Sequence, residues 1–551
     1  MKPDTPFDPV SLEVMWSRLI NITEECWITI WRTAFSTIIG EAQDFGCELL
    51  DANGESLAHS PRSMPVFNLT LPRAVKALLQ VFPKETLTEG DVLITNDPWI
   101  CAGHLFDVAL VTPVFRNGRV VALVGSIAHC SDIGGTRDYQ AAREVYEEGL
   151  QIPPLKLFEA GEPNRTLFSI IERNVRRGDM VLGDIFAQHA ANKVAAARLT
   201  SFMDAYAIDD LGALATEVQY RAERAMRDAI SAVPDGTYTS RVAFDGLAAP
   251  LELAVAITVT GDRLHVQWDG PPQLARGGIN CTLNYTAAHT VYALKCILTP
   301  DIPSNAGCFL PITVDAPEGS ILNCAYPAAV NQRTQTGWYC APAVFAALAD
   351  VLPDRVQAFT GLPMGAAAYG RDDNGTVYND HLFQGGGQGA SAHGDGHSAL
   401  LYPTSAGNTA IEMFETRTPL VVLEKAFIAD SGGPGRHRGG LGQRIRVRKL
   451  RSDGNPALLS LHPQGMIVAT PGLHGGSPGR KASIALETPT GRRSDLELHG
   501  MAELVGREDV CTIEMPGGSG FGRPSERDAE ALERDIAEGF VTREGARAYE
   551  T

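Results

Sequence analysis

Hydrophobic residues along the chain follow two spacings, one typical of helices and one of strands. In the first segment, Val14, Leu19, Ile20 and Ile30 recur at helical spacing. Similar patterns predict helices over residues 9–39, 69–82, 183–206, 209–231, 283–298 and 338–352, and a charged helical tail over 524–548. Alternating or continuous apolar runs predict strands on both sides of an Asn-Gly turn at 53–54, over 91–130, over 235–271 and from about 378 onward.

This order of elements predicts a mixed α/β (α+β) protein with several domains. A chain of 551 residues is too long for one compact core and suggests roughly three or four folding units. We expect an N-terminal α/β region over 1–232, a central α/β region over 233–375, and a C-terminal glycine-rich β region with a helical tail over 376–551. The 55 glycines indicate many tight turns and close backbone approaches.

Two strand-like runs separated by an Asn-Gly pair predict a β-hairpin. VALVTPVF covers 108–115, RVVALVGSIA covers 119–128, and Asn117-Gly118 lies between them. Folding at this turn brings residue 129 opposite residue 106, within about a residue of register. His104 and Asp107, where the first strand begins, therefore come close to His129, where the second ends. Whether Asp107 and His129 share a face depends on bulges.

Two imidazoles and one carboxylate at the open end of a hairpin are a plausible site for Zn²⁺, Mn²⁺ or Fe²⁺. Asp44 precedes another apolar strand and is a candidate fourth ligand, and Asp132 lies three residues beyond His129. The alternative interpretation is a core hairpin whose polar ends are satisfied within the protein. Cys101 and Cys130 adjoin the site, but strand alternation directs Cys130 away from it, and buried structural thiols are the simpler interpretation.

Charge and composition exclude several classes of partner. The formal net charge of −18 argues against nucleic acid or an anionic membrane as the main partner. No run of about 18 apolar residues predicts a spanning helix, and prolines and acids interrupt the N-terminal stretch where a signal peptide needs apolar residues. The ten cysteines form no CxxC pair, so we expect reduced, mostly buried thiols in a cytoplasmic protein.

With these residues identified, the chain resembles the hydantoinase B family, which includes oxoprolinases and subunits of acetone and acetophenone carboxylases. The similar stretches run in order along the chain and include EGDVLITNDPWICAGHLFDVALVTPVF, IAHCSDIGG, EEGLQIPPLKL, ERNVRRGDMVLGDIFAQHAAN, PDGTY, DIPSNAGCFLPITVDAPEGSILN, HLFQGGGQGAS, DSGGPGRHRGGLGQ and ERDAEALERDIAEGFVTREGA. The resemblance implies a divalent metal held by Asp44, His104, Asp107 and His129. It also implies a hetero-oligomer with an ATP-binding hydantoinase A-type subunit that activates a small substrate by phosphorylation.

The chain departs from this family in two places. The usual Gly-Gly-Thr-His-x-Pro-Asp reads Cys101-Ala102-Gly103-His104-Leu105-Phe106-Asp107 here. Where many members have His-Ile-Pro-Val-His, this chain has Ser63-Met64-Pro65-Val66-Phe67-Asn68. If those histidines handle substrate, the substrate or the chemistry of this chain is non-standard.

Weaker signals lie in the glycine-rich half. Gln384 to Gly389 could arrange N–H groups round an oxyanion, although a tight bend in β structure is the simpler interpretation. These residues lack the Gly-Lys-Ser/Thr of a P-loop, so ATP is expected to bind the partner. Asp132, Gln384, Gly386, Asp395 and His397 are weak candidates for lining the substrate cleft. Residues 431–440 hold three basic side chains among glycines, which fits a solvated turn or an anion contact.

Three functions remain open on the sequence. The first, which we favour, is the metal-binding B subunit of an ATP-dependent cyclic-amide hydrolase of hydantoinase or oxoprolinase type. The second is a subunit of an ATP-dependent ketone carboxylase, because a metal suits an enolate as well as an amide carbonyl. The third is a non-catalytic scaffold that organises the ATP-binding partner.

Overall fold

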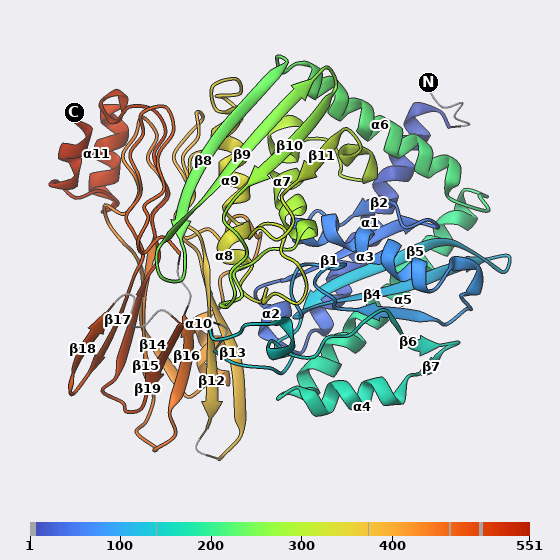
Figure 1. The fold of residues 1–551 in the computed structure, drawn as a ribbon, viewed down its shortest axis with the longest axis horizontal. Coiled ribbons are helices and arrows are strands. Elements are labelled where there is room, and N and C mark those ends of the chain that lie inside the picture. The colour runs from blue at the N-terminus through green and yellow to red at the C-terminus, as the bar shows by residue number, and fades with distance from the viewer. Residues whose placement is uncertain (1–6, 139, 373, 462–463, 495–499, 551) are drawn as a thin grey trace.

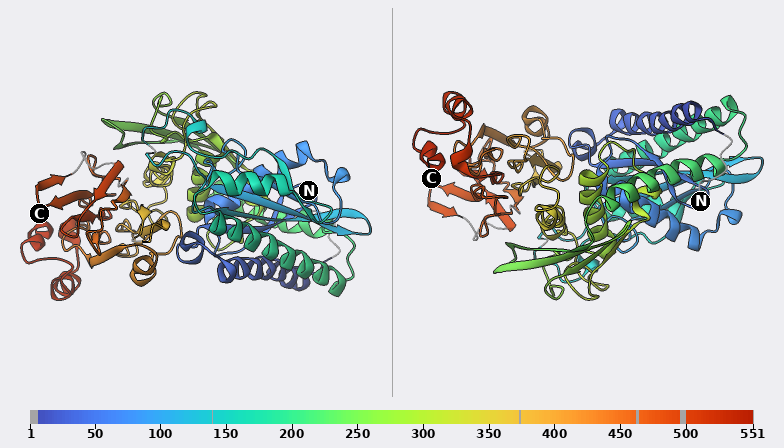
Figure 2. Two further views of the ribbon diagram at one scale, coloured as in Figure 1. Left: turned by 90° about the horizontal axis from the view of Figure 1, so that it is seen from below. Right: turned by 90° about the horizontal axis from the view of Figure 1, so that it is seen from above.

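The computed structural model describes residues 7–550, apart from 139, 373, 462–463 and 495–499. Residues 1–6, which belong to the N-terminal stretch in which no signal peptide is expected, lie outside this description. The N-terminal part (blue to teal) and the C-terminal part (orange to red) occupy opposite ends of the long axis (Figures 1 and 2). The central part lies between them. The predicted mixed α/β, multi-domain fold is confirmed.

The N-terminal part is built on one sheet, which has seven strands within the described residues. Their order is β2-β1-β5-β4-β3-β6-β7, and every neighbouring pair is antiparallel. The bounds are β1 Phe45–Asp51, β2 Ser56–His59, β3 Val92–Thr95, β4 Asp107–Arg116, β5 Arg119–His129, β6 Leu155–Glu159 and β7 Glu162–Pro163.

Helices cover both faces of this sheet. On one face lie α1 (Pro9–Thr33) and α5 (Gly178–Ala205), which run side by side (Figure 2). There Trp27 stacks on Phe45 and Ser126 donates to Gln188 at 3.2 Å. On the other face lies α3 (Pro65–Val81), packed so closely that a Cβ on Gly125 would come within 2.8 Å of Leu71. Strand alternation therefore directs Asp107 and His129 to the α3 face.

The predicted hairpin is β4–β5, and its register is shifted by one residue. Asn117 and Gly118 have φ of 51° and 73°, the left-handed conformation of a tight two-residue turn. A regular ladder from this turn pairs residue 129 with residue 106. A bulge between Val114 and Phe115 shifts the pairing, so that Asp107 lies directly opposite His129.

Several predicted helices differ from the observed ones at their ends. The first begins at Pro9, capped by Asp8, but breaks before α2 (Thr37–Gly40), because the N–H groups of Phe35 and Ser36 donate to Asp184 on α5. Val14 is 48% exposed, since the buried stripe of α1 runs through other positions. α4 (Arg165–Asn174) was not expected, and α6 spans Gly212–Ser231.

The central part contains the four-stranded sheet β11-β10-β9-β8, counted over the described residues. Its strands are β8 Gly236–Asp245, β9 Pro250–Thr260, β10 Arg263–Asp269 and β11 Ile312–Asp315. Its helices are α7 Leu283–Leu298, α8 Thr334–Gly337 and α9 Cys340–Leu348. α7 has the predicted bounds and packs on both α3 and α9, so it connects the central part with the N-terminal one.

The C-terminal part holds two further sheets within the described residues. One has the order β13-β12-β16-β19 and the other β14-β15-β20-β17-β18. The bounds are β12 Met364–Arg371, β13 Val377–Gln384, β14 Leu420–Phe427, β15 Gln443–Lys449, β16 Ala457–Leu461, β17 Ser483–Thr488, β18 Gly491–Ser494, β19 Gly500–Leu504 and β20 Val510–Glu514. Two helices complete it, α10 (Ile411–Arg417) and α11 (Ala529–Ala537). The tail helix is shorter than predicted, because Gly539 takes a φ of 77° just beyond its end.

Glycine-rich segments of this part pack backbone against backbone. A Cβ on Gly387 would meet the carbonyl oxygen of Gly440 at 1.8 Å, and one on Gly518 would meet that of Gln388 at 2.0 Å. The N–H groups of Gly387 and Gln388 donate to Pro516 and His397. These two N–H groups are engaged within the protein and are not available to an oxyanion. The interpretation of residues 384–389 as an oxyanion site stays a prediction.

The hydrophobic cores only partly follow the proposed domains. The largest core cluster takes residues from Leu12 to Leu362, on both sides of the boundary at 232/233, with a few additions beyond. A separate cluster is confined to Met364–Met515. The three-part division stays a prediction.

No helix among the described residues combines the length and the apolar character that crossing a bilayer requires.

Candidate metal centre and cavity

A cavity of about 160 Å³ lies where the three parts of the chain meet. Its lining comes from β4 and β5, from α3 and α7, and from β12 and β13. The polar lining includes Asp44, His104, Asp107, His129, Tyr285, His289, Asn331, Arg333, His381 and Gln464. The apolar lining includes Met64, Val66, Phe67, Phe106, Trp338, Met364, Phe383 and Leu401. One water needs only roughly 10–15 Å³, so the cavity is large enough for a small organic molecule.

His104, Asp107 and His129 converge in this cavity. Each offers one nitrogen or oxygen atom, and these atoms lie within 4.8 Å of one another. Nε2 of His104 lies 2.9 Å from Oδ1 of Asp107, yet neither atom has a hydrogen bond of good geometry, which is expected of two ligands that point at one centre. Nδ1 of His104 donates to the carbonyl oxygen of Asn331 at 3.4 Å, and this leaves Nε2 with a free lone pair.

Asp44 lines the same cavity, and the pairing of β1 with β5 sets its position. It directly precedes β1, and the N–H of His129 donates to its carbonyl oxygen at 3.0 Å, so the β1–β5 pairing holds it beside His129. Its carboxyl is buried, and Oδ1 has no hydrogen-bond partner among the described residues. Asp44 lines the cavity but is not one of the three residues whose ligand atoms converge within 4.8 Å.

Arg333, just before α8, holds Asp107 from the opposite side. Its guanidinium donates to Oδ2 of Asp107 and to the carbonyl oxygen of Ala102, both at 2.7 Å, and lies 4.3 Å from the ring of Tyr285. A Cβ on Gly103, whose φ is 87°, would come within 2.9 Å of both Arg333 and Tyr285. The Cys101-Ala102-Gly103 loop is therefore shaped by this arginine.

The donor atoms of the site suit a divalent cation. Burial and the carboxylate of Asp107 raise the pKa of Asp44 well above its usual value. Burial alone would raise the pKa of Asp107, but His104 and Arg333 hold it below its usual value. Burial, together with the other imidazole, lowers the pKa of His129 well below its usual range. The site thus offers two carboxyls and neutral imidazoles beside one guanidinium, and such nitrogen and oxygen donors suit Zn²⁺, Mn²⁺ or Fe²⁺.

The stretch that departs from the family faces the cavity. Met64, Val66 and Phe67, at the start of α3, contribute apolar surface to the lining. This chain thus presents an apolar wall where the resemblance leads one to expect histidines. Phe67 is 1% exposed, so its side chain is buried.

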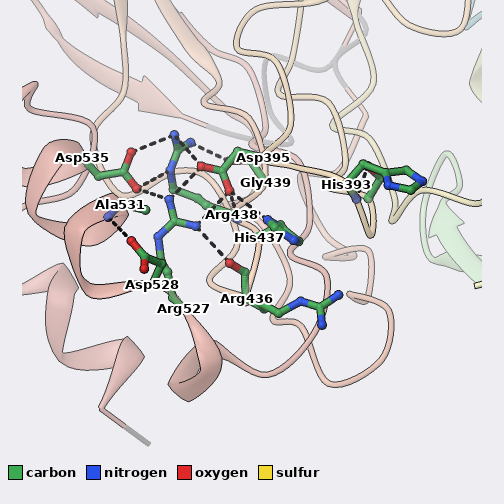
Figure 3. A network of polar contacts seen from close by, with 11 residues as sticks. His393, Asp395, Arg436, His437, Arg438, Gly439, Arg527, Asp528, Ala531 and Asp535 are labelled. Atoms are coloured by element: carbon green, nitrogen blue, oxygen red, sulfur yellow. Dashed lines mark hydrogen bonds and ion pairs between the residues drawn. The ribbon is translucent and has the colours of Figure 1, made fainter. Parts of the chain in front are cut away.

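The weaker candidates lie outside this cavity lining. Asp132 accepts a hydrogen bond from Arg176 at 2.6 Å, and Gln384 is fully buried at the end of β13. Gly386 packs against Gly361, and the carbonyl oxygen of His397 accepts from Gln388. Asp395 binds Arg527 through both carboxylate oxygens, at 2.9 and 2.7 Å (Figure 3). A role for these residues in substrate binding stays a prediction.

Asp395 belongs to an ion-pair network that fastens α11 to the glycine-rich segments (Figure 3). Arg438 donates to Asp535 on α11 at 3.1 Å, and both side chains are more than nine-tenths buried. We expect Arg438→Met to destabilise the protein by about 1–3 kcal/mol, since Arg527 still neutralises Asp535. Thermal unfolding checks this result. Arg224→Met, which removes an exposed pair, should change little, and an equal loss in both variants would contradict the prediction.

Sequence reasoning missed several polar residues of the cavity, among them Arg333, His289 and His381, which are far from the hairpin in sequence. His381 begins the stretch HLFQGGGQGAS, but nothing local indicated that its side chain reaches this cavity. His381 on β13 lies 6.3 Å from the ring of His129, and burial lowers its pKa to about 4. One signal was present: His289 and Tyr285 are polar residues spaced by four on a largely apolar helix.

The two cysteines beside the site are buried structural thiols. Cys130 packs in the core on the opposite face of the sheet, with Val108 and Leu110, as alternation predicts. Burial raises the pKa of the Cys130 and Cys101 thiols, which disfavours the reactive thiolate. All ten cysteines are free, and Cys296 is the exposed one.

Comparisons with known proteins match both the sequence and the fold of this chain. The family model described as Hydantoinase B/oxoprolinase matches residues 8–524. A Pseudomonas sp. (strain NS671) protein, whose name assigns it to a D-/L-hydantoinase as the B subunit, is 31% identical over 98% of this chain and 94% of its own length. The crystal structure of the ATP-dependent caprolactamase from Pseudomonas jessenii matches 99% of this chain and 96% of its own, with a TM-score of 0.91 and 26% identity. Nucleotide-free acetone carboxylase shares the fold, with a TM-score of 0.87 at 19% identity over 98% of this chain and 79% of its own.

Proposed function

Because the chain belongs to the hydantoinase B/oxoprolinase family, we propose that it is the metal-binding B subunit of an ATP-dependent cyclic-amide hydrolase. The observation that carries this proposal is the buried convergence of His104, Asp107 and His129 beside an organic-sized cavity. Asp44 would complete the ligand set from β1. A bound divalent cation would polarise an amide carbonyl and lower the pKa of a bound water to about 7.

The side chains around this centre would orient the metal ligands and keep water away from the substrate. Arg333 holds Asp107 ionised, and Asn331 holds the tautomer of His104. The apolar wall of Met64, Val66 and Phe67 would exclude water from one side of the substrate. An amide is a poor electrophile, so phosphorylation by a partner chain would make its carbonyl reactive enough for attack.

We assign the ATP-binding step to a hydantoinase A-type partner in a cytoplasmic hetero-oligomer. Two relatives are named as single subunits, one of a hydantoinase and one of a caprolactamase, which supports a partner chain, and the related caprolactamase is described as ATP-dependent. The N–H groups at Gly387 and Gln388 are engaged within this chain, which is consistent with ATP binding elsewhere. Ten free cysteines fit a reducing compartment.

The proposal is tested on the complex purified through a tag on this chain. Hydantoin, ε-caprolactam and 5-oxoproline are offered with ATP, with and without bicarbonate, and the metal content is measured by elemental analysis. ATP-driven ring opening without bicarbonate, with one transition metal per chain, supports the hydrolase. Strict dependence on bicarbonate with a ketone substrate would identify a carboxylase instead. A chain that binds no metal although its histidines are intact would identify a scaffold.

A further inference from the structure

His289 is a polar residue of the cavity that the metal centre leaves without a role. It lies on α7, is 3% exposed and lines the cavity. Neither ring nitrogen has a hydrogen-bond partner among the described residues. Buried polar atoms in native proteins are nearly always paired, so two unpaired nitrogens on one imidazole require an explanation.

The position of His289 separates it from the proposed metal. Its ring contacts Tyr285 edge-on, with ring centroids 4.6 Å apart, and Tyr285 lies one helical turn earlier on α7. Tyr285 also lies against Arg333, which binds Asp107. Tyr285 and Arg333 thus link His289 to Asp107, and His289 is not among the residues whose ligand atoms converge.

The chemistry of the ring defines what it can bind. Burial lowers the pKa of His289 to about 3, so the imidazole is neutral at pH 7, with one nitrogen donating and the other accepting. Within the described cavity lining, Arg333 is the one lysine or arginine. Its guanidinium already donates to Asp107 and to Ala102. A carboxylate near His289 would thus find no free cation, whereas an uncharged group of the –CO–NH– type could pair with the ring nitrogen that it meets, as a donor or as an acceptor.

We propose that His289 binds the substrate directly, through an uncharged group of the substrate that both donates and accepts a hydrogen bond and is not the amide under attack. The inference rests on the proposed function, because it takes the reacting carbonyl to lie at His104, Asp107 and His129. It makes His289 a specificity residue. A ring with a second amide-type group is bound better than a simple lactam of the same size.

The test measures binding separately from turnover. The complex is titrated calorimetrically with hydantoin, which has further amide-type groups, and with 2-pyrrolidinone, a five-membered ring with one. We expect His289→Phe to weaken hydantoin binding about 10–100-fold and to change 2-pyrrolidinone binding less than about threefold. His289→Asn keeps one donor and one acceptor and should retain most of the affinity. His265→Phe, on the exposed face of β10, is the matched control.

The outcomes distinguish this inference from the proposed function. Unchanged hydantoin binding in His289→Phe, or no binding to the wild-type complex, overturns the inference. So does loss of metal or of thermal stability in His289→Phe, since either would show a structural role. If binding depends on His289 while ATP drives no ring opening, the inference stands and the hydrolase proposal fails.

Discussion

Replacing His104 or Asp107 by alanine is expected to abolish turnover while the fold stays intact. Both side chains are buried in the cavity, and each would supply one of the converging ligand atoms. Loss of the cation's effect on the reacting carbonyl removes several kcal/mol of transition-state stabilisation, so kcat should fall at least about 10³-fold. Activity of the complex, metal content and circular dichroism are measured on the same preparations.

Two comparisons make this first expectation specific. His393→Ala changes an exposed histidine outside the cavity lining and should leave turnover and metal content unchanged. Asp107→Asn keeps the shape of the side chain but removes its charge, and it should lose metal almost as fully as the alanine variant. Near-wild-type turnover in the His104 or Asp107 variants, with metal still bound, would refute the assignment of the site.

Arg333→Met is expected to cause a large loss of stability. The substitution leaves the Asp107 carboxylate fully buried without its guanidinium partner, which is 5% exposed in the folded chain. Breaking one side of a buried ion pair costs about 3–5 kcal/mol. The metal-free protein should therefore unfold at a clearly lower temperature, as a thermal scan in the presence of a chelator would measure.

Added metal should restore part of this stability. A divalent cation supplies the positive charge that Asp107 has lost, so the rise in Tm on adding Zn²⁺ or Mn²⁺ should be larger in Arg333→Met than in the wild type. Arg176→Met is the matched control, because it leaves the buried Asp132 unpaired outside the cavity lining. Added metal should not restore the stability that Arg176→Met loses. An equal metal response in both variants would contradict the proposed link between Arg333 and the metal centre.

The part of the site built by neighbouring strands was predictable from the sequence. The Asn117-Gly118 turn determines a two-residue hairpin, and a hairpin brings its two open ends together regardless of the rest of the fold. His104, Asp107 and His129 could therefore be placed near one another without an alignment. The one-residue shift that sets Asp107 opposite His129 comes from a bulge, which local sequence does not specify.

Local patterns also determined most elements but fewer of their ends. α7 has the predicted bounds because its apolar residues recur over four uninterrupted turns. α1 is shorter than predicted because a carboxylate on α5, Asp184, accepts from the N–H groups at its end. Such a partner, about 150 positions away, leaves no trace in the local periodicity.

By itself, then, the sequence determined the mixed α/β class, the hairpin and the convergence of His104, Asp107 and His129, because each depends on contacts over short stretches of chain. Only the tertiary structure decided that Arg333 pairs with Asp107, that His289 and His381 line the same cavity, and that Met64 and Phe67 form its wall. It also decided that the glycines near 387 are needed for backbone packing. These features join segments hundreds of residues apart, and the close packing of three parts of the chain, rather than any local pattern, brings them together.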